Sequence, residues 1–199
     1  MIRYIKDILD VLNVLGNSGM LLTFTDATPD NTYMISGKGR IVISSTKSGQ
    51  RITTIYNNPL GVNATIQSDA NSTITISGEL IQFDAYNTSH ITSFSTKDQK
   101  SLVLVSVRSS MCTYFHLTNC PKLQNLNIAK TSALTNIEVS EVPMINTISV
   151  GTSSQEAADA VIALITEYAD NHGTVIAMGA DPYYTDLQTA ATAAGWTLI

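Results

Sequence analysis

The chain has 199 residues, a length that suits one sizeable hydrophobic core or two small packed units, and 44% of its residues are hydrophobic. Charged residues make up only 14%, the net charge is -5, and no cluster of Lys and Arg is large enough to release counterions from a phosphate backbone. The composition therefore argues against a nucleic-acid partner, and the abundance of Ser, Thr and Asn favours a β-rich scaffold.

Residues 1–20 are predicted to form an amphipathic helix that ends near Gly16. Apolar residues recur there at spacings of three and four, which is the pattern of one helical face. This face consists of Ile5, Ile8, Leu12 and Leu15. Lys6, Asp7 and Asp10 interrupt the apolar run, so we expect neither a signal peptide nor a membrane span. Two heptads are too short to be stable alone, so the helix must pack on the chain's own body, on copies of itself, or in a groove of another protein.

Residues 21–79 are predicted to form short β-strands. Alternating runs such as Arg40-Ile-Val-Ile and Ser72-Thr-Ile-Thr-Ile are separated by Gly, Asn, Asp and Pro, the residues that commonly mark turns between strands. Periodicity alone leaves two arrangements open for this segment, which are a small sandwich and the opening coils of the repeat that follows.

Residues 80–150 carry a repeat with a period of eleven residues. Seven units share the template apolar-x-x-apolar-x-apolar, and the fourth unit begins one residue early. The units are Leu80, Phe83, Ala85; Ile91, Phe94, Thr96; Leu102, Val105, Val107; Cys112, Phe115, Leu117; Leu123, Leu126, Ile128; Leu134, Ile137, Val139; and Ile145, Ile148, Val150. Strands of an ordinary sandwich can imitate a few such units, but sandwich loops vary in length, so the fixed period favours a stacked repeat.

The template fits a strand that buries one face. Residues at i and i+2 of a strand point to the same side, and the apolar residue three positions earlier folds in at the corner. Two units make a coil of about 22 residues, within the range of leucine-rich repeats. We therefore predict a mainly β protein in which residues 80–150 form a leucine-rich-repeat-like β-solenoid with a sheet along each long side.

Residues 151–199 are predicted to form an α/β cap in the order helix, strand, helix, strand. Ser153 and Glu156 have the spacing of a capping box at the start of the first helix. The later elements are expected as a strand at 174–178, a helix near 184–193 and a strand at 196–199. Trp196 is interpreted as a core anchor. A cap is expected because an open solenoid exposes an apolar end and an unpaired sheet edge.

The titratable side chains show no catalytic or metal-ligating pattern. His90 and His116 can share one outer face, but no carboxylate stands at a recognisable spacing from either, which favours surface histidines over a dyad. Cys112 and Cys120 lack metal-ligand partners and are interpreted as a core thiol and a turn thiol. Residues 151–154 precede a helix and can cradle an anion, although ordinary capping also explains them. We therefore predict no enzymatic activity, no cofactor and no metal.

The run LTNCPKLQNLNIAKTSALTNIEVS, from Leu117 to Ser140, resembles the short leucine-rich repeats found in surface proteins of gut anaerobes and in virion proteins of their tailed phages. The ending, with Gly179-Ala-Asp-Pro and Ala194-Gly-Trp, is similar to the tails that follow such repeats. Where the family pattern has Asn after Ser, this chain has Lys130 and Glu141, so the asparagine ladder of those proteins is not expected.

The resemblance implies a non-catalytic structural or binding protein. Bacterial members generally carry an export signal, whereas a phage protein assembled in the host cytoplasm needs none, which favours a virion protein such as a head fibre, capsid decoration or tail appendage. The expected partners are copies of the chain and a capsid or tail protein, both engaged through Ile5, Ile8, Leu12 and Leu15. A host surface glycan or protein is a further candidate partner. The alternatives are a bacterial cell-surface adhesion or protein-binding module and an enzyme acting on glycans, which would need paired carboxylates on one strand face.

Overall fold

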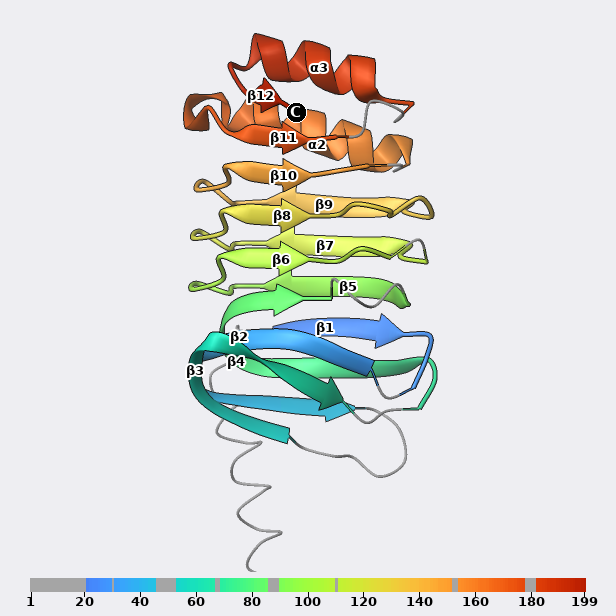
Figure 1. The fold of residues 1–199 in the computed structure, drawn as a ribbon, viewed down its shortest axis with the longest axis vertical. Helices are drawn as coiled ribbons and strands as arrows, with labels where there is room; N and C mark the ends of the chain where they lie inside the picture. The colour runs from blue at the N-terminus through green and yellow to red at the C-terminus, as the bar shows by residue number, and fades with distance from the viewer. Residues whose placement is uncertain are drawn as a thin grey trace, which may run out of the picture.

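The computed structural model of the chain describes residues 21–29, 31–45, 53–66, 69–85, 90–109, 111–151, 154–177 and 182–199. Within these ranges twelve strands form one continuous sheet, so the prediction of a mainly β protein is confirmed. Most of the strands are stacked one above another along the long axis, and helices cover the C-terminal end (Figure 1). The predicted helix at 1–20, with Ile5, Ile8, Leu12 and Leu15, lies outside the described residues.

The first four strands form an antiparallel part of the sheet. They are β1 (Leu21–Asp26), β2 (Asn31–Ser45), β3 (Thr53–Ile66) and β4 (Ser72–Asp84). β2 pairs with β3 and β4, and β1 pairs with the first half of β4. The boundary predicted between residues 79 and 80 falls inside β4, because this single strand belongs both to the antiparallel part and to the repeat. The described strands of residues 21–79 therefore share one sheet with the repeat.

Gln99 and Gly78 tie the antiparallel part to the first coil. Gly78 has φ 128°, and a Cβ atom there would lie 2.6 Å from the carbonyl oxygen of Arg40, so only glycine lets β2 and β4 approach at this point. The buried Gln99 side chain accepts a hydrogen bond from the Leu80 N–H at 3.0 Å and donates one to the Gly78 carbonyl at 3.1 Å. These bonds satisfy two backbone groups at the bend.

The repeat forms two stacks of parallel strands. Its strands are β5 (Ile91–Lys97), β6 (Leu104–Ser106), β7 (Tyr114–Thr118), β8 (Asn125–Asn127), β9 (Asn136–Ser140) and β10 (Thr147–Ser149). The end of β4 continues through β6, β8 and β10 to β11 (Thr174–Ile176) and β12 (Thr197–Leu198), and we call this series the even stack. β5, β7 and β9 form the odd stack. β1 runs antiparallel to both β4 and β5 and so joins the two stacks at their base.

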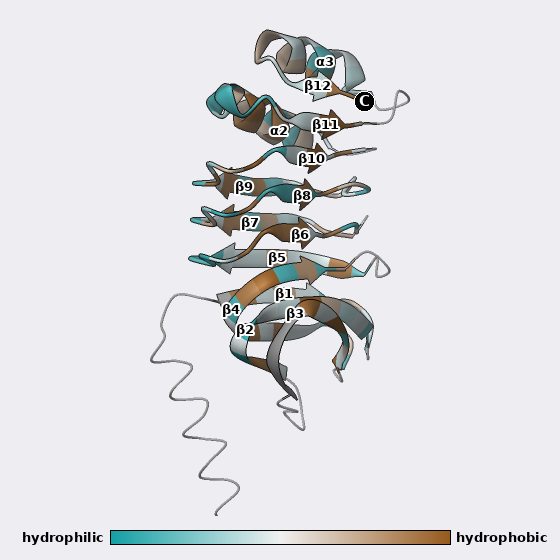
Figure 2. Ribbon diagram, turned by 60° about the vertical axis from the view of Figure 1, so that its left-hand side comes forward, coloured by the Kyte–Doolittle hydropathy of each residue, from teal (hydrophilic) through white to brown (hydrophobic). Residues whose placement is uncertain are grey.

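The register between stacked strands follows the predicted two-unit period. In the even stack, paired residues lie 22 positions apart between β4 and β6, 21 between β6 and β8, and 22 between β8 and β10. Nearly all template residues are at most 3% exposed, which places the core between the two stacks. The exceptions, Ile137 and Val139, are partly buried in β9, which packs against a helix instead of a further strand. Figure 2 shows the hydropathy of the residues along these strands.

The corners of the coils use residues with a left-handed backbone. These residues are Asp98, Asn119, Lys130 and Glu141, with φ between 52° and 64°. The residue that follows each of these left-handed residues accepts a hydrogen bond at its carbonyl from the N–H three residues later. After Lys130, for example, the Thr131 carbonyl accepts from the Leu134 N–H at 3.0 Å. Such a turn directs the chain inward, so the first apolar residue of the next unit enters the core.

The fourth unit of the repeat, which starts at Cys112, begins one residue early because the corner before it is one residue shorter than the others. Ala129 and Lys130 separate the buried Ile128 from the corner residue Thr131, whereas Arg108 alone separates Val107 from Ser109. The Ser109 carbonyl still accepts from the Cys112 N–H at 3.2 Å, so the turn is kept. The missing position is the one that elsewhere adopts the left-handed backbone, and the coil is therefore 21 residues long instead of 22.

The C-terminal elements occur in the predicted order. They are α2 (Gln155–Glu167), the short 3-10 helix η1 (Ala169–Asn171), β11, α3 (Tyr184–Ala193) and β12. The N-cap of α2 is Ser154, whose Oγ accepts from the Ala157 N–H at 3.3 Å, so the predicted capping box beginning at Ser153 is wrong by one residue. Gly195, with φ 72°, follows α3 as expected. Trp196 is a core anchor, since it is 5% exposed and its Nε1 donates to the Tyr168 carbonyl at 3.1 Å.

Aromatic rings run through the core from the base into the stack. Phe24 and Tyr33 contact Phe83, and Phe94 lies between Phe83 and Phe115 with ring centroids 5.5 and 4.9 Å apart. All five rings are at most 1% exposed. This column joins the antiparallel part and the first two coils of the odd stack into one core.

Replacing Phe94 with alanine should lower the free energy of unfolding by about 3–5 kcal/mol, because it leaves a cavity between two other rings. Urea unfolding followed by circular dichroism measures this change. The control is Ser95→Ala on the outward side of the same strand, which should stay within about 0.5 kcal/mol of the unmodified protein. A change of less than about 1 kcal/mol for Phe94→Ala would contradict the ring column as a core element.

Candidate functional site

The outward faces of the two stacks present side chains in rows, because neighbouring strands are in register. The rows of the odd stack are Ser93, Tyr114, Asn136; Ser95, His116, Glu138; and Lys97, Thr118, Ser140. One row of the even stack runs Asp84, Ser106, Asn127, Ser149, Ile176. Most of these side chains are short and polar, as expected for the solvent face of a sheet.

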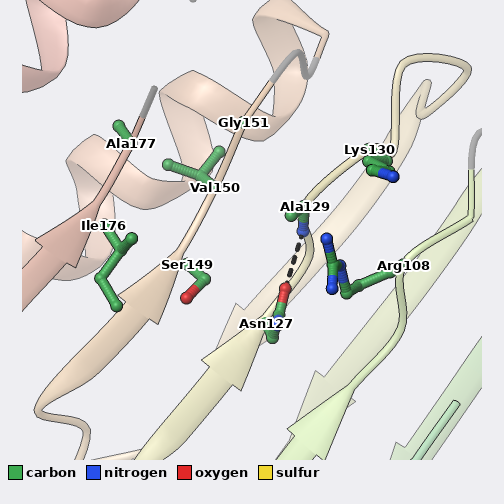
Figure 3. Close-up of a pocket in the computed structure, with 9 residues that line it drawn as sticks. All are labelled: Arg108, Asn127, Ala129, Lys130, Ser149, Val150, Gly151, Ile176 and Ala177. Carbon is green, nitrogen blue, oxygen red and sulfur yellow. Dashed lines mark hydrogen bonds between the residues drawn. The ribbon is translucent and has the colours of Figure 1, made fainter. Parts of the chain in front are cut away.

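A hollow of about 270 Å³ lies on the even stack at the carboxyl ends of β8, β10 and β11 (Figure 3). Arg108 and Lys130 stand on one side of it, and Val150 and Ile176 stand on the other. Asn127 and Ser149 lie between these two sides, and the other described residues of the lining are Ala129, Gly151 and Ala177. The hollow thus combines a cationic side, neutral hydrogen-bonding groups and an apolar side.

Corner geometry places the two cations. Arg108 is the single residue at the short corner after β6, and Lys130 is the left-handed residue of the corner after β8, with φ 64°. The Lys130 N–H donates to the Gly151 carbonyl at 2.9 Å, which joins two successive corners beside the hollow. The Asn127 side chain is held there because its Oδ1 accepts from the Ala129 N–H at 3.1 Å (Figure 3).

The charge around this hollow differs from that of the rest of the chain. Only three basic residues follow Lys100 in the sequence, and two of them, Arg108 and Lys130, line the hollow. Within the part of the chain that the structure describes, no Asp or Glu lines it. A protein with net charge -5 therefore has a locally cationic depression on its even stack.

A second hollow of about 200 Å³ adjoins the first on the same face. It shares Asn127 and Ser149 with the first hollow and extends toward Asp84 across β6 and β8. Its other outward lining residues are Leu104, Ser106, Asn125 and Thr147. The two hollows together cross five strands of the even stack, from Asp84 on β4 to Ile176 on β11.

The odd stack carries a hydrogen-bonded aromatic pair on its outward face. The rings of Tyr114 and His116 are stacked with centroids 4.0 Å apart. The Tyr114 hydroxyl lies 2.9 Å from His116 Nδ1, and His116 Nε2 lies 2.6 Å from Asn136 Oδ1. A glutamate, Glu138, is 3.6 Å from Nδ1. The Asn136 Oδ1 atom accepts from Nε2, and together these contacts hold the pair as an ordered polar surface on the odd stack.

The two histidines suggested by sequence do not form a dyad. The register pairs His116 with Ser95, while His90 lies before the start of β5 and its carbonyl accepts from the Ala27 N–H. Among the described residues, no group of three His, Cys, Asp or Glu side chains has a geometry that could hold a metal ion. Neither described helix is long and apolar enough to span a bilayer.

Both cysteines are buried free thiols. Cys112 is the core thiol that the repeat predicted. Cys120 lies in the corner after β7, as expected for a turn thiol, but its side chain points into the core and is fully buried. Burial raises the pKa of both thiols from 9.0 to about 11. Thiolate chemistry at neutral pH is therefore disfavoured at both positions.

The sequence pattern does not indicate the hollow. Of its residues, the pattern marks Gly151 in the motif before α2, Val150 as a template residue, and Lys130 as a departure from the asparagine of similar repeats. The early start of the fourth repeat unit, just after Arg108, can be seen in the sequence. That it reflects a corner with one residue fewer becomes clear only when the corners are compared in the structure. Ile176 lies outside the repeat. Its place at the end of a polar row is known only from the parallel pairing of β11 with β10, which puts Ile176 beside Ser149.

No known protein family matches the sequence, no curated protein is significantly similar to it, and no solved structure matches its fold. The residues of the two outward faces therefore have to be interpreted from their own chemistry.

The buried thiols should not react with a disulfide reagent such as dithionitrobenzoate in the folded protein at pH 8. Two thiols per chain should react once guanidinium unfolds it. A Ser95→Cys variant supplies the control, since its added outward thiol should react rapidly in the folded state. Fast reaction of either native thiol at pH 8 would contradict the burial of these side chains.

Stability should also fall in alkali. Because the folded thiols have a higher pKa than the unfolded value of 9.0, their stabilising contribution is complete below pH 9 and is lost as the pH rises through about 11. Urea unfolding at several pH values, compared with the Cys112→Ala/Cys120→Ala double variant, measures this loss. Equal pH dependence for both proteins would contradict the prediction.

Proposed function

We propose that the stacked segment is a leucine-rich-repeat-like β-solenoid that serves as a non-catalytic scaffold. The two strands per coil, the 21- or 22-residue register and the shared corner turn support this reading of the repeat. Such a scaffold holds its faces rigid, because each coil is bonded to the coil below it. Its outward rows are then suited to display and binding.

The proposed setting is a phage virion, where the chain acts as a head fibre, capsid decoration or tail appendage. The observation that carries this proposal is the one-ended stack, which starts at an antiparallel base and ends in a helical cap (Figure 1). The base lies next in sequence to residues 1–20, and Ile5, Ile8, Leu12 and Leu15 there are the proposed contacts to copies of the chain and to a capsid or tail protein. The resemblance of the repeat to phage virion proteins favours this setting.

A bacterial cell-surface adhesion or protein-binding module is the second candidate. The cationic hollow and the Tyr114–His116 pair favour it to the extent that they bind a glycan or protein. Both candidates use the same scaffold and differ in what the N-terminal segment contacts, so attachment is the property to test.

Removing one whole coil tests the solenoid. Deleting residues 123–144 joins Lys122 to Ile145 and keeps an equivalent corner, since Cys120-Pro-Lys precedes the deletion and Val142-Pro-Met ends it. We expect this variant to fold cooperatively with a reduced free energy of unfolding. The control deletion of residues 123–133 removes half a coil, moves every later strand to the opposite stack and should prevent folding. Equal behaviour of the two deletions would contradict the solenoid.

Removing residues 1–16 tests attachment. Mass spectrometry of particles purified from the encoding phage should detect the full chain, and a complementing copy without residues 1–16 should be lost from particles while remaining folded. Light scattering should show a smaller oligomer for the truncated protein. A chain present in infected cells but absent from particles would refute the virion setting, and full incorporation of the truncated copy would refute residues 1–20 as the anchor.

A further inference from the structure

We propose that the outward face of the odd stack binds a divalent late transition-metal ion, such as Cu²⁺ or Zn²⁺, between β7 and β9. The ligands are His116 Nδ1, a carboxylate oxygen of Glu138 and the hydroxyl oxygen of Tyr114, and water takes the remaining positions. The proposal adds a metal site to the scaffold, and it holds whether the protein is mounted on a virion or on a cell surface.

The spacing of the donor atoms is the first support. His116 Nδ1 lies 2.9 Å from the Tyr114 hydroxyl oxygen and 3.6 Å from Glu138 Oε2. Two atoms that are each about 2.0–2.2 Å from one ion lie about 3.0 Å apart at a right angle and about 3.4 Å apart in a tetrahedron. The ring nitrogen therefore faces two oxygens at separations close to those that a shared ion imposes.

The orientation of the imidazole is the second support. Its Nε2–H donates to Asn136 Oδ1 at 2.6 Å. A neutral ring with its hydrogen on Nε2 carries its lone pair on Nδ1, which is the atom that faces the tyrosine and glutamate oxygens. Metal-binding histidines usually donate their other ring N–H to a carbonyl or carboxylate in this way. Stacking of the Tyr114 ring, with centroids 4.0 Å apart, also holds the imidazole in place.

Exposure and donor chemistry select the kind of ion. The side chains of His116 and Glu138 are 25% and 55% exposed, and Tyr114 is 36% exposed, so an ion can reach them and keep bound water. One nitrogen and two oxygens suit copper, nickel or zinc, whereas magnesium and calcium prefer oxygen ligands alone. Copper should bind most tightly of these divalent ions. When the tyrosine oxygen binds the ion, its proton passes to solvent.

Strand register creates this set of ligands. Tyr114 and His116 share one face of β7, and β9 places Glu138 directly beside His116, 22 positions further along the chain. The expectation of no metal rested on spacing in the sequence, where this neighbour is not visible. The set also differs from the groups of His, Cys, Asp and Glu that are absent from the described residues, because its third ligand is a tyrosine. A bound ion would link β7 to β9, the last strand of the odd stack.

The test is isothermal titration calorimetry of the full chain, without an affinity tag, using CuCl₂, ZnCl₂ and MgCl₂. One Cu²⁺ ion per chain should bind with a Kd of about 10 μM or tighter, and Zn²⁺ should bind about ten-fold more weakly. Mg²⁺ should show no binding below about 1 mM, because the site offers a nitrogen ligand. Failure of Cu²⁺ to bind, or equal binding of Mg²⁺, would overturn the proposal.

Matched variants locate the ion. His116→Gln should weaken Cu²⁺ binding at least about 30-fold, Glu138→Gln about ten-fold, and Tyr114→Phe about three-fold. The control is His172→Asn, which removes an exposed imidazole outside the odd stack and introduces a residue that tolerates the left-handed backbone there. This control should leave the affinity within about two-fold of the unmodified protein. Weakening by His172→Asn as large as that by His116→Gln would overturn the site.

Nuclear magnetic resonance decides the matter without a variant, should His116→Gln fail to fold. Because Cu²⁺ is paramagnetic, a small fraction of an equivalent should broaden the imidazole signals of His116 before those of His172. Earlier or equal broadening at His172 would place the ion elsewhere and would overturn the proposal.

Discussion

Hydrogen bonding between successive coils is the constraint on which the rest of this structure depends. A strand of three residues such as β6 cannot exist alone, and it is stable here because β4 lies on one side of it and β8 on the other. This requires the corners to return the chain to the same position after each coil. The left-handed residues and the bonds within each turn meet that requirement, and the apolar template fills the space that the coils enclose.

The ends of the stack solve the problem of unpaired edges in different ways. At the base, β1 pairs with both stacks and leaves neither first strand open. At the other end, the odd stack stops at β9 and packs against α2, while the even stack continues through β11 and β12. The added strands carry residues that do not follow the repeat, and this is how an aliphatic side chain comes to lie at the end of a polar row.

The strands and the core of the repeat could be predicted from sequence, because burial on one face of a strand imposes a spacing that remains visible in the chain. The order of the C-terminal elements was predictable for the same reason, since helices and strands differ in period. The cap residue was misplaced because Ser153 and Ser154 are chemically alike, and only backbone geometry selects Ser154. The course of β4 across the expected boundary was missed, since a strand that changes partners along its length has no signature in composition.

The candidate site was largely invisible in the sequence for a different physical reason. Arg108 and Lys130 are 22 residues apart in the chain, and their placement on one side of a hollow follows from a corner that lacks a residue. Ile176 enters from outside the repeat altogether. Sequence periodicity describes what is alike in successive coils, whereas a site is made by the places where coils differ.

The direction of the hydrogen bonds between coils gives the molecule a mechanical anisotropy. Bonds within each stack point along its long axis, so a pull between base and cap loads the bonds of one interface head-on, and the chain would yield by losing coils in turn. A force across the long axis runs along the strands, so it is opposed by the covalent backbone of each strand. It is also opposed by the aromatic rings that join the base to the first coils. A protein held at its base and loaded through a side face would therefore resist shear better than tension.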